Sequence, residues 1–299
     1  MDLTSELARF GPESTAAPSL DESQRYCRQL AESHYENFTV VSLLWPRRLH
    51  QHLCNVYAYC RWADDLADET NDAERSLALL DWWEQSLRAA TRGDARHPVF
   101  VALADTMQQF QLPNEPFLDL LAAFRRDQRQ RRYETFAELL DYCRCSANPV
   151  GRIVLRLGDS FSDENARLSD SVCTGLQLAN FWQDVQRDFA IGRVYVPLED
   201  CRRLSVDPAR LAGPVTDELR ELLAFQCGRA RDYLMAGEPL VRQVSNDLRL
   251  PVRLFVDGGL EILRSIERQR YDVWTSRPTV GKLAKLKLLA RGWVRSRFG

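Results

Sequence analysis

The feature that most constrains the fold is a long stretch without glycine or proline, which covers residues 49–69. Its apolar side chains at positions 53, 56, 57, 60 and 63 follow the period of one helix face. A second stretch with the composition of a long helix covers residues 170–190 and ends near Gly192. Each stretch contains two aspartates four residues apart. The sequence therefore predicts two long helices, each of which carries a pair of acids.

The two pairs are Asp64 with Asp68 and Asp184 with Asp188. On a helix, residues four apart point the same way, with Cβ atoms about 5–6 Å apart. A single pair of this kind is most often part of a solvated helix face. Here, however, Asp64 and Asp184 lie among Trp, Tyr, Phe, Leu and Ala residues, where a carboxylate is costly to bury unless it is paired or binds a metal.

Acidic helix faces of this kind predict a magnesium site. Mg²⁺ binds one or two carboxylates and keeps its other positions for water and substrate phosphate. Two such faces opposed across a central cavity would present oxygens to two or three Mg²⁺ ions. The pairs therefore predict a protein that binds a diphosphate through Mg²⁺.

The composition indicates an ordinary globular chain, with 45% hydrophobic and 27% charged residues. A net charge of −2 gives no reason to expect a nucleic-acid partner. The eight cysteines show no paired CxxC spacing, and the four histidines form no ligand motif. Buried free thiols in a reducing compartment are therefore expected, which favours a cytoplasmic protein. There is no apolar run of 18 residues, so no membrane-spanning helix is expected.

Helical periodicity dominates the chain after residue 20, and only residues 193–197 have the composition of a short extended segment. No alternation of strands and helices and no long linker is evident. We therefore expect a single all-α bundle over residues 21–299, preceded by a disordered lead over residues 1–20. Further helices are predicted over residues 76–90, 99–110, 116–124, 135–145, 216–236, 252–274 and 280–297.

The last stretch of the chain, residues 281–299, has six basic residues and no acid. This composition suits a helix that lies on an anionic lipid surface, which would place the protein peripherally on the inner membrane face. A terminal helix that packs on the bundle explains the same pattern, and both readings stay open.

Taken together, these segments resemble the squalene/phytoene synthases, a family of all-α enzymes that join prenyl diphosphates head to head. The resemblance runs from about His34 to beyond Arg193. It depends on the order of the aspartate pairs, on Gln177-x-x-Asn180 before the second pair and on Arg193-Val-Tyr195 after it. It implies a single-domain helical bundle of the isoprenoid (trans-prenyl) synthase type, with a prenyl diphosphate as substrate.

The resemblance also implies a role for each matching residue. Asp64, Asp68, Asp184 and Asp188 would bind the metal, and Asn180 would assist the second pair. The residues implied to contact the diphosphate or help it to leave are His34, Arg61 and Tyr195. Those implied to line the prenyl channel are Phe38, Tyr57, Tyr142 and Gln177. Asn37 and Arg193 lie in the matching segments and are expected to bind substrate too.

Two departures from the usual family pattern favour one branch. After Tyr142-Cys143 the family usually has Val-Ala-Gly-x-Val-Gly, whereas this chain has Ser146-Ala-Asn148-Pro-Val-Gly. Before Phe38 the family usually has Ser, whereas this chain has Asn37. Both traits resemble the hydroxysqualene synthases of the bacterial hopanoid pathway, which convert presqualene diphosphate to an alcohol. The resemblance thus implies a carbon–oxygen lyase that needs no NADPH.

In this hypothesis Mg²⁺ neutralises the leaving diphosphate, and water captures the rearranged carbocation to give hydroxysqualene. Asn148, together with Asn37, is a candidate to orient that water. Alternatively, Asn148 caps or kinks the helix before Pro149, because a residue that precedes proline disfavours the helical conformation.

Two other functions stay open from the sequence. A condensing synthase of the same family would make presqualene diphosphate, squalene or phytoene from two prenyl diphosphates. A non-catalytic helical assembly factor would share the fold without the reaction, although intact aspartates in both pairs disfavour it.

Overall fold

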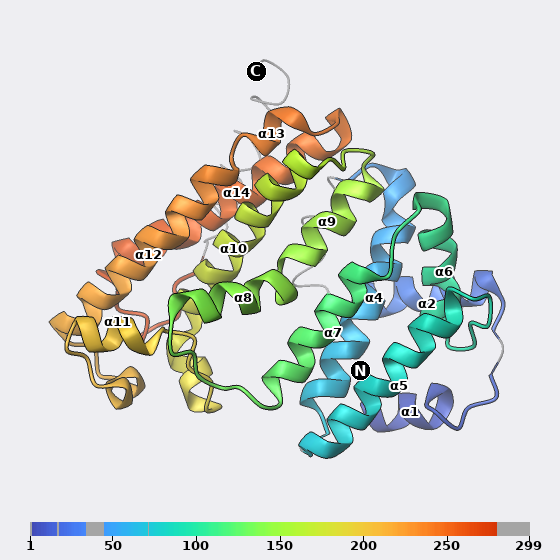
Figure 1. The fold of residues 1–299 in the computed structure, drawn as a ribbon, viewed down its shortest axis with the longest axis horizontal. Helices are drawn as coiled ribbons and strands as arrows, with labels where there is room; N and C mark the ends of the chain where they lie inside the picture. Colours follow the sequence, from blue (N-terminus) through green and yellow to red (C-terminus); the bar gives the residue numbers. More distant parts are fainter. Residues whose placement is uncertain (1, 17, 34–44, 71, 280–299) are drawn as a thin grey trace. The chain divides into compact units, whose positions relative to one another are not determined.

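A computed structural model describes residues 2–16, 18–33, 45–70 and 72–279. Within these ranges every element is a helix, apart from one isolated β-bridge between Arg132 and Val194 (Figure 1). The predicted all-α fold is therefore confirmed. The chain divides into two compact units. Unit 1 comprises Met1–Arg129 with Arg156–Asp159, and unit 2 comprises Gln130–Leu155 with Ser160–Gly299. A single domain stays a prediction.

Unit 1 is built around one long central helix, α4. This helix contacts α2, α5, α6 and α7 (Figure 1). The helices of unit 1 are α1 (Leu3–Phe10), α2 (Leu20–Ser33), α4 (Arg47–Asp68), α5 (Ala73–Ala90), α6 (Pro98–Phe110) and α7 (Glu115–Asp127). The core of the unit is aromatic: Trp62 of α4 stacks on Trp83 of α5, with ring centroids 5.3 Å apart. Both side chains are fully buried.

A buried histidine, His97, joins α6 to this aromatic core. Its Nδ1 accepts a hydrogen bond from the backbone N–H of Val99 at 3.1 Å and so caps the helix. The ring is edge-on to Trp62 and Trp83, at centroid distances of 4.5 and 4.9 Å. Burial lowers the pKa of His97 to about 3. The histidine is therefore neutral in the folded protein near neutral pH.

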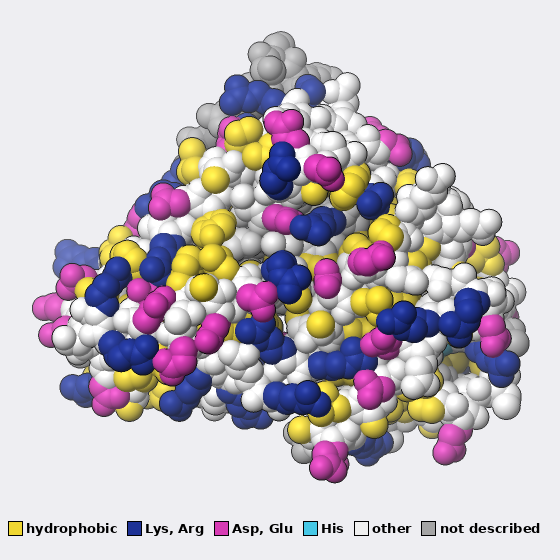
Figure 2. All heavy atoms as spheres, in the orientation of Figure 1, with side chains coloured by type: hydrophobic (Ala, Val, Ile, Leu, Met, Phe, Trp, Pro, Cys, Tyr) yellow, Lys and Arg dark blue, Asp and Glu magenta, His cyan; other side chains and the backbone are white. Residues whose placement is uncertain are grey.

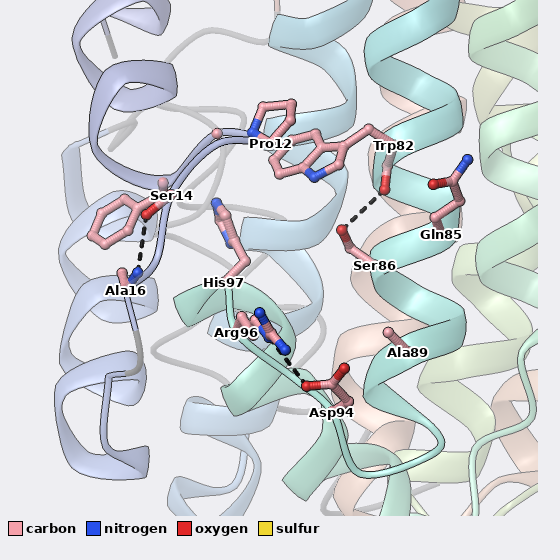
Figure 3. Close-up of a pocket in the computed structure, with 12 residues that line it drawn as sticks. Pro12, Ser14, Ala16, Trp82, Gln85, Ser86, Ala89, Asp94, Arg96 and His97 are labelled. Atoms are coloured by element: carbon pink, nitrogen blue, oxygen red, sulfur yellow. Dashed lines mark hydrogen bonds and ion pairs between the residues drawn. The ribbon is translucent and has the colours of Figure 1, made fainter.

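The N-terminal residues contain a helix that the sequence analysis did not predict. Where a disordered lead was expected, Leu3–Phe10 form α1, and both Leu3 and Phe10 are buried. A cavity of about 390 Å³ lies between the segment after α1 and helix α5. In Figure 3, Pro12 lies in the segment after α1, the Trp82 side chain extends toward it from α5, and His97 lies below them. None of the predicted site residues lines this cavity.

Unit 2 is built around α10, which contacts α8, α12, α13 and α14 (Figure 1). Its elements are α8 (Phe136–Ser146), α9 (Asn148–Leu157), which begins in this unit, α10 (Asp163–Ala190), α11 (Leu198–Arg203), a 3₁₀ turn (Pro208–Ala212), α12 (Asp217–Gly237), α13 (Leu240–Gln243) and α14 (Asn246–Arg268).

Glycines let the central helices of unit 2 approach closely. A Cβ atom at Gly175 of α10 would come within 2.8 Å of Leu234 Cγ and 2.9 Å of Leu234 N on α12. A Cβ atom at Gly259 of α14 would come within 2.8 Å of Leu176 Cδ2. The close contact of α10 with α12 and α14 therefore depends on the absence of side chains at these positions.

All eight cysteines are free thiols and six of them are buried, as the sequence predicted. No helix in the described part of the chain is long and apolar enough to cross a membrane. The face drawn in Figure 2 carries acidic and basic side chains interspersed with one another. The basic stretch 281–299, with its predicted membrane contact, lies outside the described residues.

Replacement of Gly175 by alanine tests the close helix packing. Because the added Cβ would clash with backbone as well as side-chain atoms of Leu234, we expect the free energy of unfolding to fall by about 1–3 kcal/mol. Gly228→Ala on α12 is the matched control, since nothing lies within 4 Å of its added Cβ. The control should be neutral or stabilising by up to about 1 kcal/mol. Equal effects of the two variants in urea denaturation would contradict the packing.

The buried His97 predicts a specific acid sensitivity. The unfolded state, with a histidine pKa near 6.5, binds a proton between about pH 6.5 and pH 3, whereas the folded state does not. The free energy of unfolding is therefore highest above pH 6.5 and decreases as the pH falls below it, because protonation of His97 stabilises the unfolded state. Between pH 7 and pH 5 the wild type should lose about 2 kcal/mol more than His97→Asn, which retains a capping group. Parallel urea-denaturation profiles of the two proteins would contradict this assignment.

Candidate functional site

The first aspartate pair lies at the C-terminal end of α4. Tyr57, Arg61, Asp64 and Asp68 follow one another at helical spacing and so share one side of this helix. The last turn of α4 contains no basic residue. Because the C-terminal end of a helix carries partial negative charge, carboxylates here are destabilised unless a cation is present.

Arg61 neutralises part of this acidic group. Arg61 forms an ion pair with Asp65, and its Nη1 lies 3.4 Å from Asp64 Oδ2. Its Nη2 also lies 3.6 Å from Glu69 Oε1. Burial raises the pKa of Asp65 to about 6, against the opposing effect of Arg61. The sequence analysis predicted Arg61 as a diphosphate contact but missed Asp65, although its position four residues after Arg61 indicates the pair.

The second aspartate pair lies in the last two turns of α10. Burial and, to a smaller extent, the neighbouring negative charge of Asp184 raise the pKa of Asp188 to about 7. Asp184 forms a two-pronged ion pair with Arg277, in which Nε lies 2.6 Å from Oδ1 and Nη2 lies 2.8 Å from Oδ2. The sequence analysis did not find Arg277. It is 93 residues away along the chain, so no local spacing reveals the contact.

The predicted neighbours of the second pair lie on the same helix or follow it directly. Gln177 and Asn180 precede Asp184 at helical spacing, and Asn180 is exposed. The chain turns back at Gly192, which has φ of +79°. The backbone N–H of Arg193 then donates to the carbonyl oxygen of Asp188 at 2.8 Å.

An aromatic group lies beside the second pair. Tyr195 stacks on Phe181 of α10, with centroids 3.9 Å apart and an angle of 11° between the rings. Tyr142 of α8 lies 5.8 Å from Tyr195 and 6.2 Å from Phe181. Asp188 lines a small recess together with Phe181 and Tyr195. The structure thus brings Tyr142 and Tyr195, two predicted site residues, together next to Asp188.

Asn148 joins α9 to α10. Its Oδ1 accepts a hydrogen bond from Thr174 Oγ1 at 3.0 Å, and the side chain is buried. Three residues later, a Cβ at Gly151 would lie within 2.6 Å of Cys173 Sγ, so the two helices are in close contact. Helix α8 ends at Ser146 and α9 begins at Asn148. The helix break expected before Pro149 is therefore present.

The residues of both pairs have the chemistry that Mg²⁺ requires. No group of three or more His, Cys, Asp and Glu side chains in the described ranges is arranged to hold a metal by itself. Each pair nevertheless offers hard oxygen donors at the negative end of a helix. Mg²⁺ commonly takes one or two carboxylates and completes its octahedron with water and phosphate. Each pair therefore has donor atoms of the kind that Mg²⁺ binds.

Three predicted substrate-binding residues, His34, Asn37 and Phe38, lie outside the described residues.

Known proteins resemble this chain along most of its length. The sequence pattern of the squalene/phytoene synthase family matches residues 31–284. The 15-cis-phytoene synthase of Synechococcus elongatus is 33% identical over 290 residues, which are 91% of this chain and 94% of that protein.

Solved structures resemble the fold as well. The squalene synthase HpnC from Alicyclobacillus acidocaldarius is 45% identical, with a TM-score of 0.81 over 85% of this chain and 96% of that one. A dehydrosqualene synthase in complex with a ligand is 25% identical, with a TM-score of 0.85 over 93% of this chain and 98% of that one. The chain therefore belongs to the squalene/phytoene synthase family of prenyltransferase-like synthases.

Proposed function

We propose that this protein is a hydroxysqualene synthase, which ionises presqualene diphosphate and adds water to the rearranged cation. The observation that carries the ionisation step is the carboxylate pair at the negative end of the central helix in each unit. The 45% identity to the squalene synthase HpnC, against 33% to the phytoene synthase, favours a squalene-type product over phytoene. The Ser146–Gly151 departure from the usual family pattern supports the same choice.

Asp64 and Asp68 on α4 and Asp184 and Asp188 on α10 would hold Mg²⁺. When bound, the metal would act as a Lewis acid that neutralises charge on the leaving diphosphate. If Asp184 held the metal, Arg277 would be free to bind a phosphate oxygen, which a guanidinium can do through two parallel hydrogen bonds.

The aromatic group next to Asp188 would stabilise the carbocation after the diphosphate leaves. The faces of Tyr142, Phe181 and Tyr195 carry negative electrostatic potential, and each attracts a cation by roughly 0.5–2 kcal/mol. Because these rings pack against one another, they are held in place before substrate arrives. Phe181 and Tyr195 each cover one face of the other, so a face that is not covered in this way would have to attract the cation.

The hydrogen bond between Thr174 and Asn148 argues against a role of Asn148 in binding the water that captures the cation. Its partner Thr174 precedes Asp184 by ten residues on α10. At 1.5 Å per residue this is about 15 Å along the helix axis. The reacting carbons of presqualene diphosphate are only a few bonds from the leaving oxygen. Asn148 would therefore reach them only if the cation moved far from the diphosphate, and its contact with Thr174 favours the helix-positioning role.

Two alternatives have specific support. The phytoene synthase match covers nearly the whole chain, so a condensing synthase that makes presqualene diphosphate, squalene or phytoene is the second candidate. A non-catalytic assembly factor of the same fold is the third, and the four intact aspartates disfavour it.

A product assay with two substrates tests this proposal. The protein is incubated with Mg²⁺ and either presqualene diphosphate or farnesyl diphosphate, in water enriched with ¹⁸O, without NADPH. We expect an alcohol that contains ¹⁸O from the first substrate and no hydrocarbon or presqualene diphosphate from the second. Condensation of farnesyl or geranylgeranyl diphosphate, with presqualene diphosphate unchanged, would contradict the proposal and favour a condensing synthase.

A further inference from the structure

We propose that Ser146, the last residue of α8, is a positioning residue that holds the water which captures the carbocation. This role rests on the proposed function, because it assumes that the reaction ends with the addition of water. It takes the place of the role that the sequence analysis gave to Asn148, whose side chain accepts a hydrogen bond from Thr174. Neither the sequence analysis nor the family resemblance assigns a role to Ser146.

Ser146 continues the buried face of α8. Leu139, Tyr142 and Cys143 of this helix are buried. Ser146 follows Leu139 by seven residues and Tyr142 by four, which is the spacing of one helix face. Its Oγ atom is itself buried. Because the Cα–Cβ bonds of a helix tilt toward its N-terminal end, the Ser146 side chain leans toward the turn that carries Tyr142.

The Ser146 hydroxyl makes no hydrogen bond within the described part of the chain. Other helical serines of this protein do: Ser86 Oγ donates to the carbonyl oxygen of Trp82 at 2.9 Å, and Ser171 Oγ donates to that of Arg167 at 3.2 Å. In both cases the acceptor lies four residues earlier, where a helical serine commonly finds its partner. A buried hydroxyl without a partner is unfavourable, and water, which both donates and accepts hydrogen bonds, would satisfy it.

Ser146 lies one helical turn from the aromatic group beside Asp188. Tyr142 packs on Tyr195 and Phe181, with ring centroids 5.8 and 6.2 Å away. Those two rings line the small recess that contains Asp188. The four residues from Tyr142 to Ser146 span about 6 Å of helix. A water on the Ser146 hydroxyl would therefore lie close to the rings that are proposed to stabilise the cation.

The hydroxyl would orient the water without removing its proton. Ser146 Oγ would accept a hydrogen bond from the water, which leaves a lone pair of the water oxygen to face the cation. The new C–O bond forms from this lone pair, and the resulting oxonium loses one proton to an oxygen of the departed diphosphate. The products are the neutral alcohol and the protonated diphosphate, so no further reactant is required.

Two substitutions of matched shape test this role, because valine and threonine have similar shapes but only threonine has a hydroxyl. Ser146→Val also restores the residue that is usual for the family at this position. Each variant and the wild type are incubated with Mg²⁺ and presqualene diphosphate in water enriched with ¹⁸O, and the products are quantified by mass spectrometry. The measured quantity is the ratio of ¹⁸O-labelled alcohol to hydrocarbon, which forms when the cation loses a proton instead of gaining water.

We expect this ratio to be about threefold to tenfold lower in Ser146→Val than in Ser146→Thr, as for the loss of one hydrogen bond. The ratio compares two fates of the same cation, so it does not depend on how fast the diphosphate leaves. Ser146→Ala, which removes the hydroxyl without adding bulk, should also give a lower ratio than the wild type. This variant keeps the test decisive if Ser146→Val does not fold.

Stability provides a second measurement that separates water binding from a structural role. A hydroxyl without a protein partner adds nothing to stability, so Ser146→Ala should leave the urea midpoint unchanged or raise it. Ser76→Ala is the matched control, because the buried Ser76 Oγ donates to the carbonyl oxygen of Ala67 at 2.9 Å. The control should lower the midpoint. An equal decrease in Ser146→Ala would show that the hydroxyl has a structural partner and would overturn the role of Ser146.

The product ratios also distinguish this role from the proposed function. Equal ratios in Ser146→Val, Ser146→Thr and the wild type would overturn the role of Ser146 and leave the proposed function intact. A wild type that gave no ¹⁸O-labelled alcohol would contradict both.

Discussion

The structure depends on the placement of carboxylates at the negative ends of its two central helices. In each unit the longest buried helix ends in an aspartate pair, where the helix dipole opposes further negative charge. The unfavourable charge is tolerated because an arginine compensates it in each unit: Arg61 on α4 and Arg277 beside α10. In the proposed function, a metal ion would add positive charge at each pair.

A metal ion would affect the ion pairs of the two arginines differently. Arg277 binds an aspartate that is itself a proposed metal ligand, so the metal and the arginine compete for Asp184. Arg61 binds mainly Asp65, which is buried and unsuited to a hydrated metal. The first unit would thus accept Mg²⁺ without breaking its main ion pair, whereas the second would have to release Arg277. This difference follows from burial, because a buried carboxylate retains its cation more firmly than an exposed one.

Local patterns were sufficient to predict the two long helices that carry the aspartate pairs, because the helical period depends on residues close together in the sequence. Residues 49–69 were predicted as a helix, and α4 covers Arg47–Asp68. Contacts between distant segments were not predictable in this way. The Arg277–Asp184 pair joins residues 93 apart, and the Asn148–Thr174 bond joins residues 26 apart. The burial of Asp65 depends on how other helices cover α4. Helix α1 was missed because the composition around Gly11 and Pro12 suggested an unstructured lead.

We propose that Asp64 and Asp68 in unit 1 and Asp184 and Asp188 in unit 2 bind Mg²⁺ for the leaving diphosphate. A crystal structure with Mg²⁺ and an analogue of presqualene diphosphate whose leaving oxygen is replaced by sulfur tests this claim most directly. We predict Mg²⁺ within about 2.0–2.1 Å of carboxylate oxygens from both pairs, with phosphate oxygens completing the octahedra. A diphosphate bound through only one pair, with Arg277 still on Asp184, would contradict the account.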